Sequence, residues 1–283
     1  MKPAVQAAEK AGPSNGRRLA IALTILGMIY HNQWRLTEAE PLLRRAMGFW
    51  ESNPASDEEW RLRTTVSLAA VYNTTRRFAL SERLLRRQLS IRRNPQADSL
   101  EGAQALHALG NAQEGQRRHT EAESSYRESL AILQRLPGQV DKVAVVTMSL
   151  GASQLQTRRH REALENLEKA LAIYGQLYSE AHPDTLEPSL LLARVYVEIG
   201  RPLEAERLLK QALVTANLTC GPEDPRTGVV FVHYARVLRV LGRRSESAKL
   251  EREGKAILEK SSLMDPSRYT VDLSELPADR GRR

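Results

Sequence analysis

Small and large apolar residues recur along the chain with a period of 41 or 42 residues. In each period a small residue directly follows a large one, and a second small residue stands twelve positions later. The first small column consists of Gly27, Ala69, Gly110, Gly151, Ala193 and Ala235. The second small column consists of Ala39, Ser81, Ala122, Ala163, Ala205 and Ser247. Four positions further on stands a large residue, which is Leu43, Leu85, Tyr126, Leu167 or Leu209 and is replaced only at Glu251.

This pattern predicts a pair of helices in every period. Small residues let two helix backbones approach closely, and a large residue of the partner helix fills the space beside them. Alternating strand-like runs are nearly absent, apart from a weak candidate at residues 269–273. We therefore predict a stack of helical hairpins in which each hairpin buries its apolar faces against its neighbours.

The columns resemble the tetratricopeptide repeat. The clearest copy combines Leu192-Ala193 and Gly200 with a second helix at residues 204–213. The His-Pro-Asp-Thr turn at residues 182–185 is similar to the inter-repeat turn of the longer, 42-residue variety found in kinesin light chains. The resemblance covers residues 17–260, which is most of the chain.

The resemblance implies an all-α fold, namely a right-handed α-solenoid (superhelix) of about six hairpins. A polar C-terminal capping helix, in which Glu251 and Gly254 depart from the pattern, is expected to end it. The repeats are predicted at residues 17–60, 61–99, 100–142, 143–185, 186–228 and 229–260. We expect a disordered leader at residues 1–16 and an extended or disordered tail at residues 261–283.

An aspartate stands before five of the expected first helices. A carboxylate at this place can accept hydrogen bonds from the free N–H groups of the first turn and interacts favourably with the helix dipole. We therefore predict N-caps at Asp57, Asp98, Asp141, Asp184 and Asp224.

Composition is that of an ordinary folded chain, with 41% hydrophobic and 27% charged residues among 283. The single cysteine, Cys220, excludes an intrachain disulfide and a cysteine-based zinc cluster.

The longest apolar run, residues 19–30, is too short to span a bilayer. Arg17 and Arg18 precede this run, as in an export signal, but the run is in register with the later repeats and no small-residue cleavage site follows it. We expect a cytoplasmic protein.

No catalytic, cofactor or metal site is predicted. The six histidines are scattered over different repeats and none forms a one-turn pair with a nearby glutamate, as a helical zinc site requires. His119 and His160 share one column of adjacent repeats, and a packing role is favoured there over metal binding. The sequence also lacks a glycine-rich phosphate loop and a nucleophile elbow.

The fold implied by the resemblance places the first helix of each repeat on a concave wall, which suits an extended or helical peptide. We predict that the groove is lined by first-helix residues that lie away from the packing columns. They are Thr24, Met28, His31, Val66, Ala70, Asn73, His107, Asn111, Glu114, Met148, Ala152, Leu190, Arg194, Val232 and Arg236.

A complete column of arginines stands between the two helices of every repeat. Its members are Arg35, Arg77, Arg118, Arg159, Arg201 and Arg243. Such an edge could bind an acidic protein or a nucleic-acid backbone. The alternative is a structural role, because a cation at this turn meets the carbonyl end of the first helix. The formal net charge is +8, but residues 19–260 hold 34 basic against 29 acidic residues, which favours the structural role.

The prediction is therefore a non-catalytic scaffold, without a cofactor, that binds a protein or peptide partner in its concave groove. Two alternatives remain: a sensor or regulatory module acting on a partner enzyme or transcription factor, and an anion-binding surface on the arginine edge. A monomer is expected, and nucleic acid is the less favoured partner.

Replacing Gly151 by leucine tests the packing columns. The larger side chain enters a close helix contact, so Gly151→Leu should lower the free energy of unfolding by at least about 2 kcal/mol. Chemical denaturation of both proteins measures the difference. An unchanged free energy would show that the columns are misplaced.

Overall fold

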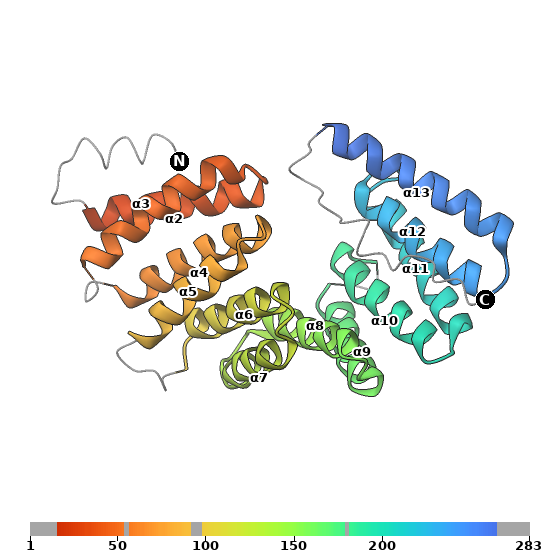
Figure 1. Ribbon diagram of the computed structural model, residues 1–283, viewed down its shortest axis with the longest axis horizontal. Coiled ribbons are helices and arrows are strands. Elements are labelled where there is room, and N and C mark those ends of the chain that lie inside the picture. The colour runs from red at the N-terminus through yellow and green to blue at the C-terminus, as the bar shows by residue number, and fades with distance from the viewer. Residues whose placement is uncertain (1–15, 54–56, 92–97, 179–180, 265–283) are drawn as a thin grey trace. The chain divides into compact units, whose positions relative to one another are not determined.

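The computed structural model describes residues 16–53, 57–91, 98–178 and 181–264, and these residues form an all-α solenoid of helical hairpins (Figure 1). Labels follow Figure 1. The helices are α2 (Gly16–Asn32), α3 (Leu36–Ser52), α4 (Glu58–Thr74), α5 (Phe78–Ser90), α6 (Leu100–Gly115), α7 (His119–Arg135), α8 (Val140–Gln156), α9 (His160–Leu177), the 3-10 turn η2 (Pro183–Thr185), α10 (Leu186–Glu198), α11 (Pro202–Thr219), α12 (Pro225–Val240) and α13 (Arg244–Met264).

The chain divides into two compact units, Met1–Leu177 and Tyr178–Arg283. The first holds four hairpins, α2/α3 to α8/α9, and the second holds α10/α11 and α12/α13. Within each unit the first helices of successive hairpins pack on one another, and each second helix packs on the first helix of the next hairpin. We call the row of first helices in one unit its first-helix layer. The second helices form the other layer.

The predicted packing columns are the places where the two helices of a hairpin touch. A Cβ atom added to Gly27 would lie 2.5 Å from Leu43, and one added to Gly110 would lie 2.4 Å from the Tyr126 ring. One added to Gly151 would lie 2.8 Å from Leu167. Tyr126 and the two leucines are almost completely buried. The small residue of one column and the large residue of the other thus form one contact, as the sequence predicts.

The last hairpin achieves its close approach at a different place. Glu251 replaces the large residue and pairs with Arg239 of α12 and with Lys255. Gly254 is buried, and an added Cβ would lie 2.8 Å from the carbonyl oxygen of Gly228. Gly254 therefore does not lie on the polar side of α13. Because it has no side chain, α13 can lie close to α12 at this position.

The helix ends refine the predicted boundaries. α2 begins at Gly16, and α13 continues to Met264, so residues 261–264 are helical although the sequence assigned them to the tail. α4, α8 and α12 each begin a few residues before the predicted start of their repeat. Residues 1–15 of the predicted leader and 265–283 of the predicted tail lie outside the described residues.

Two of the five predicted aspartate caps are confirmed. Asp57 accepts a hydrogen bond from the N–H of Trp60, and Asp224 accepts one from the N–H of Arg226. The other three are wrong. Ser99 caps α6, while Asp98 binds Arg135. Asp141 lies inside α8, and Asp184 lies inside η2, where the His182 side chain provides the cap.

Every hairpin turn has the same backbone geometry. The residue before each arginine of the arginine column has a positive φ, and these residues are Trp34, Arg76, Arg117, Arg158, Gly200 and Gly242. The N–H of each positive-φ residue donates to the carbonyl three residues back. The N–H of the following arginine donates to the carbonyl five residues back, as from Arg118 to Gln113 at 2.9 Å. This is the Schellman motif, which satisfies the last carbonyls of the first helix. The arginine column therefore begins each second helix.

Replacing Arg117 by glycine should stabilise the protein. A left-handed backbone costs a non-glycine residue about 1–2 kcal/mol, whereas the extra freedom of glycine in the unfolded chain costs about 0.4–1 kcal/mol. We expect Arg117→Gly to raise the free energy of unfolding by about 0.5–1 kcal/mol in chemical denaturation. The converse variant, Gly200→Ala, should be destabilised, and a gain there would contradict the strain argument.

Candidate functional site

The arginines of the column are partly exposed, and each of them is paired with a glutamate. Five of them pair with a glutamate three residues later, in the first turn of the second helix. These pairs are Arg35–Glu38, Arg118–Glu121, Arg159–Glu162, Arg201–Glu204 and Arg243–Glu246. The negative charge of each glutamate also interacts favourably with the positive end of its own helix dipole. Each pair therefore stabilises the start of the second helix.

Four arginines of the column, including Arg77, reach the preceding hairpin. Each binds a glutamate on the earlier second helix, and a basic residue one turn further along that helix binds the same carboxylate. We call these triplets the glutamate clamps. They are Glu40/Arg44/Arg77, Glu82/Arg86/Arg118, Glu123/Arg127/Arg159 and Glu206/Lys210/Arg243.

The clamp carboxylates are largely removed from water. The side chain of Glu123 is 4% exposed and that of Glu82 is 11% exposed. Burial alone would raise the pKa of Glu82, but hydrogen bonds from Arg86 and Gln116 and the charge of Arg118 bring this pKa below its ordinary value. The carboxylates are therefore ionised and depend on their arginines, because a buried charge without its partner is strongly destabilising.

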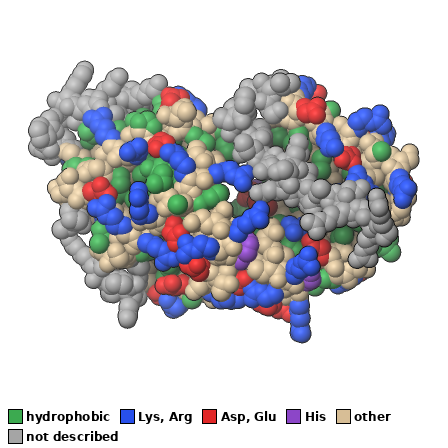
Figure 2. All heavy atoms as spheres, in the orientation of Figure 1, with side chains coloured by type: hydrophobic (Ala, Val, Ile, Leu, Met, Phe, Trp, Pro, Cys, Tyr) green, Lys and Arg blue, Asp and Glu red, His purple; other side chains and the backbone are tan. Residues whose placement is uncertain are grey.

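These contacts give the arginine column a structural role. Figure 2 likewise shows basic side chains beside acidic ones over the described helices of the face displayed. An external anion would have to compete with carboxylates that already lie within 2.5–3.2 Å of the guanidinium groups, such as Glu40 at Arg77 and Glu162 at Arg159. The geometry gives no support to the arginine edge as an anion-binding surface.

The predicted groove residues belong to the first helices, but two of them are buried in the packing. Thr24 is fully buried and donates to the carbonyl of Ala20, and its Oγ1 lies 2.7 Å from Oγ1 of Thr64. Trp50 donates to the same Thr64 hydroxyl at 2.9 Å. Val232 in the second unit is 5% exposed. Neither Thr24 nor Val232 can contact a partner on an open surface.

Several other predicted residues connect successive first helices. His31 Nε2 lies 3.4 Å from Thr74 Oγ1, and His107 Nε2 lies 3.0 Å from Ser149 Oγ. Asn73 donates to the Ala108 carbonyl, and Glu114 accepts from Ser153 at 2.8 Å. Sequence reasoning placed these side chains on the right helices, but it did not anticipate that they form hydrogen bonds between neighbouring hairpins.

The remaining groove residues of the first unit differ in what they offer. Met28 is 41% exposed, and Asn73 keeps its Oδ1 atom without a hydrogen-bond partner among the described residues. Asn111 accepts from the Tyr126 hydroxyl at 2.9 Å. The partly exposed apolar members are Val66, Ala70, Met148 and Ala152. This layer thus presents methionine, small apolar residues and a few amides.

The second unit presents cations on its first-helix layer. Arg194 of α10 pairs with Glu198 at 2.9 Å, and Leu190 of the same helix packs against the core. Arg236 of α12 is partly buried and has no hydrogen bond or ion pair among the described residues. Burial, followed by the charges of Arg194 and Arg239, lowers the pKa of Arg236 below its ordinary value, although the nearby carboxylate of Glu251 acts in the opposite direction. A desolvated guanidinium next to other cations favours the approach of an anion.

Among the residues that the structure describes, no group of three or more histidine, cysteine, aspartate or glutamate side chains is arranged to hold a metal ion. In the same residues no helix combines the length and the apolar character needed to cross a membrane.

Comparisons with known proteins agree with the repeat pattern. A model of the tetratricopeptide repeat matches residues 60–135 and 142–217, which is more than half of the chain, and a second model of this repeat matches residues 19–52. No curated protein matches the sequence.

Solved structures with the same fold include a putative kinesin light chain of Podosopora anserina with nearly identical TPR-like repeats. It is 24% identical with a TM-score of 0.62, over 73% of this chain and 99% of that one. BtubC from P. vanneervenii is 18% identical with a TM-score of 0.64, over 88% and 94% of the two chains. A Rap protein complexed with competence and sporulation factor is 15% identical with a TM-score of 0.62, over 92% and 79%. At these identities the likeness concerns the fold alone.

The stability of the first unit should depend on the protonation of His107. Burial lowers the pKa of His107 to about 4, from 6.5 for an exposed histidine. Between these values the unfolded chain binds a proton that the native chain does not, so the free energy of unfolding should fall as the pH is lowered through this window. The clamp carboxylates of Glu82 and Glu206 have pKa values below 4.5, so their loss of stabilisation comes at lower pH.

Denaturation midpoints measured between pH 7 and pH 4 check this expectation, because His107→Gln should flatten the slope above pH 4. A slope that this variant leaves unchanged would contradict it. His233, whose pKa burial also lowers to about 4, should contribute in the same direction in the second unit.

Proposed function

Because the chain belongs to the tetratricopeptide repeat family, we propose that it is a non-catalytic scaffold that binds a partner protein or peptide on its first-helix layers. The fold supports this role, since stacked hairpins present a broad surface made from many helices. The described residues offer such a surface in both units, with Met28 exposed in the first and Arg194 and Arg236 in the second.

The observation that carries the proposal is the state of Arg236. A guanidinium that is partly buried, lies near other cations and has no carboxylate bound to it is unfavourable in the free protein. Glu251 is near enough to act on Arg236 but does not bind it, so a carboxylate of a bound partner would supply the direct pair and the forked hydrogen bonds that arginine can donate. The proposed partner therefore places an acidic side chain or a chain terminus on the first-helix layer of the second unit.

Charge reversal at Arg236 tests the proposal. A partner captured on the intact chain is purified, and its Kd is measured with the wild type and with Arg236→Glu. We expect Arg236→Glu to weaken binding at least about tenfold, because it replaces an attraction by a repulsion in a partly desolvated place.

The matched control is Arg207→Glu, which makes the same charge change at an exposed position on α11, in the other layer of the same unit. Binding should stay close to the wild-type value in this variant. Equal losses in both variants would indicate an effect of net charge alone, and no loss in either would overturn the assignment of this surface.

A further inference from the structure

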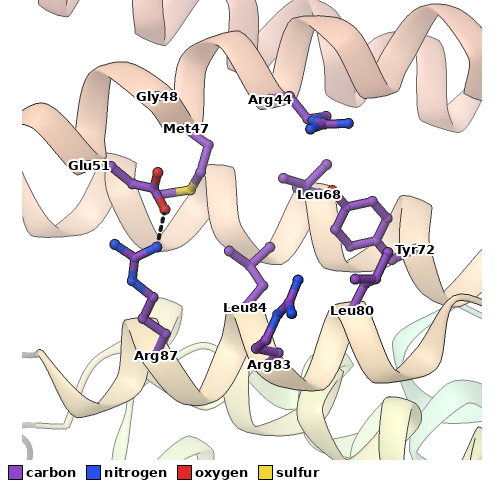
Figure 3. A pocket seen from close by; sticks show the side chains of 10 residues that line it. All are labelled: Arg44, Met47, Gly48, Glu51, Leu68, Tyr72, Leu80, Arg83, Leu84 and Arg87. Carbon is purple, nitrogen blue, oxygen red and sulfur yellow. Dashed lines mark hydrogen bonds and ion pairs between the residues drawn. The ribbon is translucent and has the colours of Figure 1, made fainter.

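A cleft of about 430 Å³ opens on the other layer of the first unit, away from the first helices (Figure 3). It lies between the second helices α3 and α5, with α4 behind it. α3 and α5 both pack on α4 but make no comparable contact with each other, so the space between them stays open. The lining extends over two turns of each helix, which corresponds to a length of about 10 Å.

The floor of the cleft is apolar. Met47 of α3 and Leu68 of α4 are buried beneath it, and Tyr72 and Leu84 are partly buried along its sides. Leu80 stands on the edge with 37% of its surface exposed. An apolar floor of this kind gains free energy when another apolar side chain covers it.

The rim of the cleft carries an excess of positive charge. Arg44 of α3 lies 3.8 Å from Glu40, and Arg87 of α5 pairs with Glu51 across one end at 2.7 Å. Arg83 has no hydrogen bond or ion pair among the described residues, and Figure 3 shows it extending from α5 toward α3. Of the three arginines on the rim, Arg44 and Arg87 have a carboxylate partner and Arg83 has none among the described residues.

Gly48 keeps the cleft open on the α3 side. It lines the cleft in the middle of a helix, where glycine is unfavourable by about 1 kcal/mol relative to alanine. Yet a Cβ atom added there would meet no atom within 4 Å, in contrast to Gly27, where the packing of the hairpin excludes a side chain. A side chain at position 48 would therefore enter the cleft without disturbing the packing of the hairpin.

We propose that this cleft is a second docking site, which binds a short acidic segment of a partner protein through apolar anchor side chains. The apolar anchors cover Leu68, Met47 and Leu84, and the acidic side chains pair with Arg44 and Arg83 on the rim. Opposite charge on the occupant is favoured because an uncharged or basic segment would displace water from these arginines without supplying a counter-charge. The site is separate from the first-helix layers and does not depend on the function proposed for them.

Selection from a library of random displayed peptides of about 12 residues, which is longer than the two helical turns of the cleft, identifies the chemistry of the occupant. The full chain is the bait, and peptides that also bind the double variant Arg44→Glu/Arg83→Glu are removed. We expect the remaining peptides to be enriched in aspartate and glutamate beside leucine, methionine or aromatic residues. Remaining peptides that are neutral or basic, or the loss of every peptide, would overturn the proposal.

A selected peptide is then synthesised and its Kd is measured with single variants. Gly48→Phe fills the cleft without changing the charge, so binding should weaken at least about tenfold. Arg45→Glu, next to Arg44 but outside the cleft, and Gly175→Phe, at another helical glycine with no atom near an added Cβ, are the matched controls. Both controls should bind as the wild type does, and circular dichroism should show the same helix content in all variants.

Undiminished binding to Gly48→Phe would show that the peptide binds elsewhere and would overturn the proposal. Equal weakening by Arg45→Glu would do the same, because the attraction would then belong to the whole face of α3. Binding that resists added salt would also contradict it, since pairs on an exposed rim are screened.

Discussion

The close approach of two helices at a residue without a large side chain is the constraint on which this structure depends. At Gly27, Gly110 and Gly151 the partner's leucine or tyrosine occupies the space that a Cβ atom would need. This contact fixes the distance between the helices of a hairpin, and thereby the place where the chain turns. The Schellman turn and the arginine that follows it take the same positions in every hairpin as a result.

The fixed turn explains how charged residues come to hold the hairpins together. Once the turn is set, its arginine lies beside the preceding second helix, where Glu82 or Glu123 is available. The position that would continue this column holds Leu164, in the last helix of the first unit. The clamps are buried enough to matter for stability, since removing the column arginine leaves an ionised, poorly hydrated carboxylate with one of its two cations.

The helical fold and its packing columns could be predicted from the sequence, because small and large residues recur at fixed spacing and each column has one physical reason. The clamps could not be predicted in the same way. Glu82 and Arg118 are 36 positions apart, and sequence spacing alone does not say which of two faces a glutamate takes. The signal was present, since a glutamate with a basic residue one turn later recurs with the period of the repeat.

The sequence predicted which helices carry the groove residues, but it did not predict which of their side chains are buried. Thr24 was assigned to the groove because its spacing places it away from the packing columns, but its hydroxyl is satisfied by a backbone carbonyl and by Thr64, so burial carries little penalty. The cap predicted at Asp98 is also wrong because of neighbouring side chains. Ser99 caps α6 in its place, and the Asp98 carboxylate pairs with Arg135. The cleft between α3 and α5 has no sequence signature, because it arises from the separation of two helices.

At Gly48 the shape of the cleft can change in evolution while the fold stays the same. Because nothing in the folded chain occupies the space above it, a larger residue there would cost the fold no stability and would still block the cleft. Relatives of this protein could therefore gain or lose a binding partner by one amino-acid change, while every hairpin remained intact.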